Sequence, residues 1–313
     1  MGKPLNTRLV VLIAGAALLL PTAVACAESA PTGDQGPPAG EPGAPVGDQG
    51  APAGDRGQTT VNIVGLTDDN KLVEFSSDNA TLRETGTISG LDGGDTKLIG
   101  IDYRVQDSKL YGVGDKGGLY TVETSGQATS VGRLTIAPEG TNFGVDFNPA
   151  ANALRVVSDT GQNLRQPFAA TPLAATVADT QLSYPPVPPA TPPAPAAPGI
   201  TGAAYTNNDA DPNTGTTLYD LDTTTDQIVI QSPANSGQLA ATGKLTVDAA
   251  TDSGFDIYSV VSGGSITEQM AFATLSAGGE YGLYRITLFS GKAERVGAFD
   301  RNVVDLAIPL NQS

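Results

Sequence analysis

A short phrase recurs along this chain and restricts its fold more than any other feature. It consists of glycine, any residue, aspartate and an aromatic or aliphatic residue, and it stands at Gly100–Tyr103, Gly144–Phe147 and Gly254–Ile257. Weaker copies stand at Gly202–Tyr205, where Ala204 replaces the aspartate, and around Asp305. Five copies at roughly equal intervals, each followed by further short apolar runs, indicate a repeated sheet unit.

One unit shows the plan of the repeat. Short runs of β-forming residues, separated by turn residues, cover Leu98–Tyr103, Lys109–Val113, Gly118–Glu123 and Gln127–Leu134. Four antiparallel strands in about 45 residues are typical of one blade of a β-propeller. In the next unit we expect a less regular fourth strand near Thr176–Tyr184.

The two ends of the repeat region complement each other. Thr60–Leu66, Lys71–Phe75 and Thr81–Ile88 match the second, third and fourth strands of a blade, but no first strand precedes them. Val303–Pro309 is a first strand with nothing after it. Pairing these segments completes a fifth blade and removes the exposed edges of an open ring. The sequence therefore predicts an all-β domain over residues 59–313, a five-bladed β-propeller closed by its C-terminal strand.

The N-terminal segment, residues 1–26, has the features of an export signal. A basic start precedes the apolar stretch Leu9–Leu20 and the small residues Ala23–Ala25, which are typical of a cleavage site. Cys26 follows directly, where a bacterial lipoprotein carries its lipid, although Ala23 replaces the usual leucine of that motif. Lipidation at Cys26 and simple cleavage both remain open, and both predict an exported protein, either anchored at the cell membrane or secreted.

Two segments are not expected to form strands. Residues 27–58 repeat Gly, Pro, Ala, Asp and Gln, and their glycines do not recur at every third position as a collagen helix requires. We expect a disordered acidic linker there. Residues 185–198 are nearly all proline and alanine, so they predict a polyproline insertion on the surface of the domain, because proline cannot donate a hydrogen bond to a sheet.

Composition excludes several classes of function. The chain has 17 Lys and Arg against 33 Asp and Glu, a net charge of −16, which disfavours nucleic acid and anionic membranes as partners. It has no histidine, which excludes Ser-His-Asp triads and His-ligated zinc, and its single cysteine cannot form an internal disulfide. We expect a monomer that contacts the membrane only through a lipid at Cys26 and binds an unknown extracellular ligand or envelope partner.

The repeated aspartates are candidates for chemistry because the first strands of a propeller line its central channel. They could act as catalytic acid, base and nucleophile on a sugar, or bind Ca²⁺ as oxygen ligands. Alternatively, each carboxylate accepts backbone N–H groups of the neighbouring blade and joins blade to blade. Repetition favours this structural role, because a catalytic site needs unlike residues. The candidates are Asp102, Asp146, Asp256 and Asp305.

A second, weaker calcium candidate lies in the polar segment that ends at Gly215. Asp209, Asp211 and Asn213 alternate as in a calcium-binding loop, but Pro212 interrupts the pattern and glycine comes one position late. A long polar hairpin is the simpler interpretation. The sequence therefore identifies no confident metal site and requires no cofactor.

Three phrases resemble a known family. The segments Leu110–Val113, Leu154–Arg165 and Thr217–Asp222, with the glycine-aspartate repeats, look like the bacterial family called domain of unknown function 4394 (DUF4394) over about residues 61–310. The resemblance implies an exported, repeat-built all-β domain and brings no catalytic residues, because the family has no assigned activity.

Taken together, these features favour a non-catalytic binding or scaffolding module at the cell envelope. The alternative is a hydrolase of a sugar or lactone that uses the channel aspartates, with or without Ca²⁺. No nucleophile and base stand together in the sequence, so an enzyme is the less favoured prediction.

Overall fold

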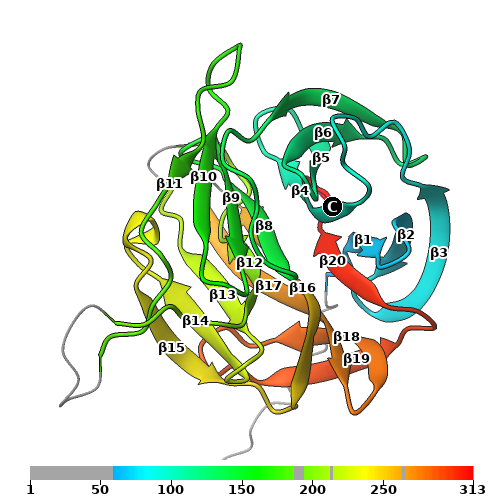
Figure 1. Ribbon diagram of the computed structural model, residues 1–313. Coiled ribbons are helices and arrows are strands. Elements are labelled where there is room, and N and C mark those ends of the chain that lie inside the picture. Colours follow the sequence, from blue (N-terminus) through cyan, green and yellow to red (C-terminus); the bar gives the residue numbers. More distant parts are fainter. Residues whose placement is uncertain (1–58, 187–193, 212–213, 263–264, 313) are drawn as a thin grey trace, which may run out of the picture. The chain divides into compact units, whose positions relative to one another are not determined.

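The repeat region forms a ring of antiparallel sheets. The computed structural model describes residues 59–186, 194–211, 214–262 and 265–312, which contain twenty β-strands and one turn of 3-10 helix. The strands form five four-stranded sheets arranged around a central axis as a five-bladed β-propeller (Figure 1). This confirms the predicted fold class and blade count. No helix in the described ranges is long and apolar enough to cross a bilayer.

Within each blade the strands follow one another from the innermost to the outermost. Blade 1 comprises β20 (Val303–Ala307), β1 (Asn62–Thr67), β2 (Lys71–Ser76) and β3 (Asn79–Thr87). Blade 2 comprises β4 (Leu98–Arg104), β5 (Lys109–Gly114), β6 (Gly118–Val122) and β7 (Ala128–Arg133). Blade 3 comprises β8 (Phe143–Asn148), β9 (Ala153–Ser158), β10 (Asn163–Pro167) and β11 (Val177–Ala178).

The other two blades follow in chain order. Blade 4 comprises β12 (Ile200–Tyr205), β13 (Leu218–Asp222), β14 (Gln227–Gln231) and β15 (Leu239–Lys244), with the 3-10 turn η1 (Ala234–Ser236) before β15. Blade 5 comprises β16 (Ala249–Ser262), β17 (Ser265–Ala277), β18 (Glu280–Ile286) and β19 (Ala293–Ala298).

The hydrophobic core lies between the blades. Inner strands such as β12 are buried along their whole length, whereas outer strands such as β3 are mostly exposed or half-buried. The buried apolar residues form five clusters, and each cluster fills the space between two neighbouring blades. Each blade therefore buries both faces of its inner strands. This explains why residues that point to either face of these strands are mostly apolar.

The two ends of the domain meet in blade 1, as the sequence predicts. Strand β20 pairs antiparallel with β1, so that Leu66 lies opposite Asp305 and Val64 lies opposite Ala307. Beyond β20, the Gln312 side chain donates to the carbonyl oxygen of Asn62 at 2.9 Å. The ring is therefore closed by hydrogen bonds between segments at opposite ends of the domain.

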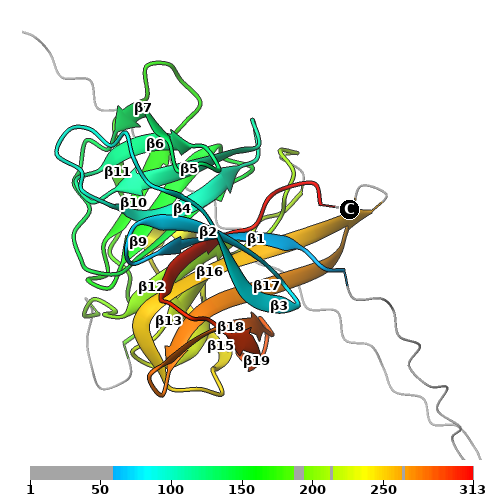
Figure 2. The same cartoon turned by 90° about the vertical axis from the view of Figure 1, so that its right-hand side faces the viewer.

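Two elements depart from the regular blade. The fourth strand expected near residues 176–184 is reduced to the two residues of β11, because the chain then leaves the sheet toward the proline-rich insertion. Strands β16 and β17 form a long hairpin that extends beyond the ring (Figure 2). In the insertion, the described residues 185–186 and 194–198 contain no strand. The predicted signal segment, Cys26 and the linker lie outside the described residues.

Candidate functional site

Glycine in the repeated phrase lets the inner strands approach one another around the axis. A Cβ atom on Gly144 would lie 2.4 Å from the backbone nitrogen of Ala203 in the next blade. A Cβ on Gly254 would lie 2.4 Å from the Cα atom of Asp305. Since real Cβ contacts essentially never fall below 3.0 Å, any larger residue at these positions would push neighbouring blades apart.

Aspartate in the phrase accepts a backbone N–H group from the next inner strand. Asp102 Oδ2 accepts from Phe147 at 2.7 Å, and Asp146 Oδ1 accepts from Tyr205 at 3.0 Å. Asp256 Oδ2 accepts from Ile308 at 2.7 Å. These bonds join blades 2 to 3, 3 to 4 and 5 to 1, and each donor lies in an inner strand or directly after it.

Asp305 is not the equivalent of the other three aspartates. Asp102 lies opposite Tyr111 in its hairpin, and the corresponding pair in blade 1 is Ala307 with Val64. Asp305 stands two residues earlier, at the position that Gly100 holds in blade 2. Its Oδ2 accepts the N–H of Ile101 at 2.8 Å and so joins blade 1 to blade 2 at a different level of the channel. The prediction that Asp305 occupies the aspartate position of the repeated phrase is therefore wrong. Ala307, two residues later, holds that position in blade 1.

Blade 4 is joined to blade 5 without a carboxylate. Ala204 is fully buried in an apolar cluster. The hydroxyl groups of Thr201 and Ser253 lie 2.6 Å apart across this boundary, and the Asn207 N–H donates to Ser259 Oγ at 2.9 Å. Inner strands can therefore be joined by other polar groups.

Three of the four candidate aspartates meet at one end of the channel. One carboxylate oxygen from each of Asp102, Asp146 and Asp256 lies within 4.8 Å of the other two. All three residues are at least 93% buried, and they line a cavity of about 20 Å³. We call this group the three-aspartate cluster. Asp305 is not part of it.

The surroundings of the cluster disfavour its charged form. Burial, followed by the charge of Asp256, raises the pKa of Asp102 well above its usual range. Burial and the charge of Asp102 do the same for Asp146, and burial raises the pKa of Asp256 to about 7. The backbone N–H groups that the carboxylates accept act in the opposite direction, but do not cancel these effects.

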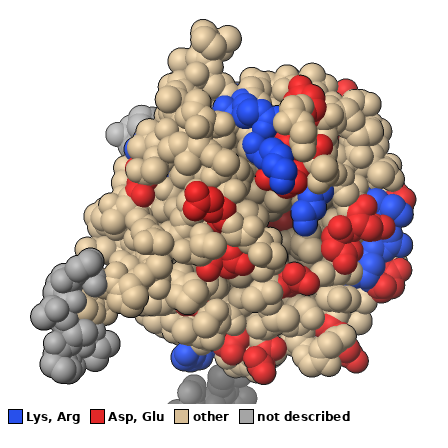
Figure 3. Space-filling view, in the orientation of Figure 1, with Lys and Arg blue, Asp and Glu red and all other residues tan. Residues whose placement is uncertain are grey.

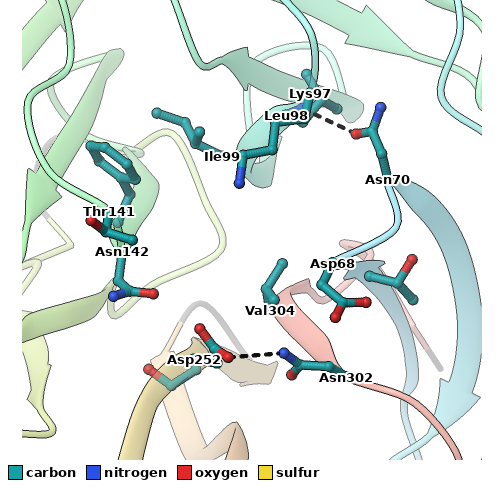
Figure 4. Close-up of a pocket in the computed structure, with 13 residues that line it drawn as sticks. Asp68, Asn70, Lys97, Leu98, Ile99, Thr141, Asn142, Asp252, Asn302 and Val304 are labelled. Carbon is teal, nitrogen blue, oxygen red and sulfur yellow. Dashed lines mark hydrogen bonds between the residues drawn. The ribbon is translucent and has the colours of Figure 1, made fainter.

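The opposite end of the channel, where the inner strands begin, holds an open pocket. Its volume is about 160 Å³, and four of the five blades contribute residues to it. Figure 4 shows these side chains around a central space. We call it the axial pocket. Its polar lining residues are Thr67, Asp68, Asn70, Lys97, Thr141, Asn142, Asp252, Ser253 and Asn302.

Several of these polar groups are held in place by their neighbours. Asn302 Nδ2 donates to Asp252 Oδ2 at 3.1 Å, and Asn70 Oδ1 accepts the N–H of Leu98 at 3.1 Å (Figure 4). Asn142 donates from both its backbone and its side chain to Asp159. In contrast, no donor among the described residues reaches the exposed carboxylate of Asp68. The pocket thus combines positioned amide groups with a free carboxylate.

The weaker calcium candidate forms a local turn in the described residues. Asp209 Oδ1 accepts the N–H of Asp211 at 2.8 Å, and Asn207 Oδ1 accepts the N–H of Asp209 at 3.0 Å. Asn213 lies outside the described residues. These hydrogen bonds are those of a polar turn. Neither Asp209 nor Asp211 lines the cavity beside Asp102, Asp146 and Asp256, although Asn207 does.

A family model for a domain of unknown function, DUF4394, matches residues 71–307. The chain belongs to this family. A search of curated proteins with the chain found no match.

Solved structures similar to this DUF4394 domain are distant. A chain of a nidogen/laminin complex is 12% identical with a TM-score of 0.43, covering 82% of this chain and 100% of that one. An auxiliary nutrient-binding protein from Bacteroides ovatus is 12% identical with a TM-score of 0.37, covering 57% of this chain and 46% of its own. A protein from Lactobacillus plantarum is 19% identical with a TM-score of 0.32, and the match covers 77% of this chain and 67% of that protein. The chain thus spans about half of the nutrient-binding protein, and these likenesses carry no function.

Most of the basic groups on the DUF4394 domain form ion pairs with acidic neighbours. In the face shown in Figure 3, basic side chains lie beside acidic ones. Around β3, Glu84 contacts both Lys71 at 3.2 Å and Arg301 at 3.0 Å. Arg133 likewise contacts Asp95 at 3.0 Å. Basic charge on this face is therefore largely neutralised locally.

Sequence reasoning missed the axial pocket. Its residues stand at the starts of inner strands, in the segments just before them and in the turn after β1, outside the repeated phrase. A signal was present, because Asn142 and Asp252 each stand two positions before the glycine of a phrase. Sequence reasoning also missed the buried Arg155, which interrupts the apolar run of β9.

Proposed function

We propose that this protein is an exported binding module, anchored through a lipid on Cys26, which takes a small polar ligand in the axial pocket and catalyses no reaction. The observation that carries the proposal is the axial pocket itself, a concave space of about 160 Å³ at the mouth of the channel. Polar side chains from four blades converge on it, as in ligand sites at the mouths of barrels. Export and anchoring rest on residues 1–26 of the sequence.

The pocket favours a neutral or cationic ligand. Asp68 and Asp252 contribute two carboxylates against the single ammonium group of Lys97, and the remaining groups are amides and hydroxyls. Such a lining can donate and accept hydrogen bonds but opposes an additional negative charge. Polyols, sugars and amines are therefore the ligand classes to test, and nucleic acid is disfavoured by the net charge of −16. We propose that the protein works as a monomer.

A thermal-shift screen tests ligand binding. A ligand that binds only the folded protein raises Tm as its concentration increases. For any ligand found, Asp68→Ala should weaken binding, because this carboxylate lines the pocket. Asp248→Ala is the matched control, since Asp248 is an exposed aspartate outside the pocket. A screen without any hit, or equal affinities for the two variants, would contradict the proposal.

Cell fractionation tests the anchor separately. We expect the wild-type protein in the membrane fraction and a Cys26→Ser variant released from it. If both variants fractionate alike, the lipid anchor is wrong, and the binding proposal stands or falls on the thermal-shift screen alone.

A further inference from the structure

The three-aspartate cluster has the geometry of a cation site. One oxygen from each of Asp102, Asp146 and Asp256 lies within 4.8 Å of the other two. Two oxygens that bind one Ca²⁺ ion at about 2.4 Å are at most about 4.8 Å apart. The adjoining cavity of about 20 Å³ has room for one ion or one water molecule.

One carboxylate oxygen in the cluster is left without a donor. Both oxygens of Asp102 accept backbone N–H groups, from Tyr103 at 2.6 Å and from Phe147 at 2.7 Å. Both oxygens of Asp256 are likewise bonded, to Ile257 and Ile308. Asp146 Oδ1 accepts from Tyr205, but no donor among the described residues reaches its Oδ2. Asp146 is 4% exposed and is one of the residues that line the cavity, so its unpaired oxygen belongs to a buried carboxylate beside this space.

Joining the blades does not require this convergence. Blade 1 carries Ala307 at the level of the cluster and is joined to blade 2 by Asp305, two residues away. Blade 4 carries Ala204 at this level and is joined to blade 5 by hydroxyl and amide groups. Three buried carboxylates close together repel one another, so their placement at one level has a cost that the other two blades avoid.

We propose that the carboxylates of Asp102, Asp146 and Asp256 bind one Ca²⁺ ion at this end of the channel. Each of the three blades supplies one oxygen, and water molecules complete the coordination of the ion. Backbone N–H groups already fix the orientation of each carboxylate, so little rearrangement is needed on binding. Because the ligands come from blades 2, 3 and 5, the ion ties together segments far apart in the sequence. Mg²⁺ is less suited, because it demands near-ideal octahedral geometry and gives up its water ligands reluctantly.

Thermal unfolding of the full chain with Ca²⁺ and with excess chelator tests the site. At a Ca²⁺ concentration about 100 times Kd, we expect Tm to rise by roughly 5–10 °C above its value in chelator. Mg²⁺ at the same concentration should give a smaller rise. Isothermal titration calorimetry of the chelator-treated protein should show one Ca²⁺ per chain.

Two variants distinguish this site from binding elsewhere. Asp146→Asn keeps an oxygen that can accept the Tyr205 N–H but removes the charge, so it should raise Tm in chelator and abolish the Ca²⁺-dependent shift. Asp305→Asn is the matched control: Asp305 is also buried and accepts an N–H from the next blade, but it lies outside the cluster. It should keep the shift. The proposal is overturned if wild-type protein shows neither a shift nor bound Ca²⁺, or if both variants retain the shift equally.

Discussion

Asp102 Oδ2 accepts the backbone N–H of Phe147 at 2.7 Å across the boundary between blades 2 and 3. Phe147 directly follows Asp146, whose own carboxylate accepts the N–H of Tyr205 in blade 4. In blade 3, one short phrase therefore accepts a hydrogen bond from the next blade and donates one to the blade before. The glycine of the same phrase provides the close approach that these bonds need. The phrase is a joint between blades as well as part of a strand.

The first prediction concerns this close approach. Gly144→Ala should lower the free energy of unfolding by about 1–3 kcal/mol, because its Cβ would lie 2.4 Å from the Ala203 nitrogen and the inner strands must separate. Gly215→Ala is the control, since nothing lies within 4 Å of its added Cβ. Urea unfolding of both variants measures the difference. Equal stabilities would show that the inner strands are not tightly packed at Gly144.

Much of the fold could be predicted because it rests on local patterns. Alternation, turn residues and the repeated phrase predict strands, and two incomplete ends predict the closure between β20 and β1. The register of β20 could not be obtained in this way. Residues two apart in a strand point to the same face, so Asp305 and Ala307 are equivalent candidates by alternation alone. Only the pairing of Ala307 with Val64 decides between them.

Local sequence patterns could not predict which residues would pair with the buried polar side chains. Arg155 Nη1 donates to Asp179 Oδ2 at 2.7 Å, and its Nη2 donates to Asn235 Oδ1 at 2.8 Å. Asp179 follows β11, and Asn235 belongs to a turn of the next blade. A charged residue within an apolar run indicates that some partner must exist, but not which one. Such partners are fixed by how the blades pack, and the same holds for the segments that form the axial pocket.

The second prediction follows from the burial of Arg155. Its side chain is 2% exposed, so Arg155→Ala truncates a large buried side chain and removes its hydrogen bonds to Asp179 and Asn235, although Asp179 keeps its ion pair with Arg165. We expect a loss of roughly 2–5 kcal/mol in the free energy of unfolding, from the space left in the core and the lost hydrogen bonds. Arg83→Ala removes an ion pair to Glu74 in which the arginine is 69% exposed, and should cost about 1 kcal/mol or less. Similar losses in urea unfolding would contradict this ranking.

The third prediction concerns Asp220 in β13. Both of its carboxylate oxygens are buried without a hydrogen-bond partner among the described residues, and burial raises its pKa well above the usual range. The folded state therefore holds this proton to a higher pH than the unfolded state, and stability should fall as pH rises above about 4. Asp220→Asn should reduce this fall between pH 5 and pH 8 in urea unfolding. Asp248→Asn, at an exposed position, should leave this fall in stability unchanged. An equal effect of both variants would show that Asp220 does not cause it.

The last prediction is the pH dependence of the three-aspartate cluster. The pKa of Asp256 is raised from 3.8 to about 7 in the folded protein, chiefly by burial, and those of Asp102 and Asp146 are raised as well. Between pH 4 and 7 the folded state therefore binds more protons than the unfolded state. In chelator, its free energy of unfolding should fall as pH rises through this range.

Added Ca²⁺ should reverse much of this loss, because the ion replaces the protons on the same carboxylates. The gain in Tm from Ca²⁺ should thus be larger at pH 8 than at pH 5, where protons compete for the oxygens. Thermal scans at both pH values, with chelator and with Ca²⁺, give the four measurements needed. In Asp256→Asn, the fall in stability with pH should be smaller and the gain from Ca²⁺ should be lost. A Ca²⁺ gain equal at both pH values would show that the ion binds at groups other than these buried carboxylates.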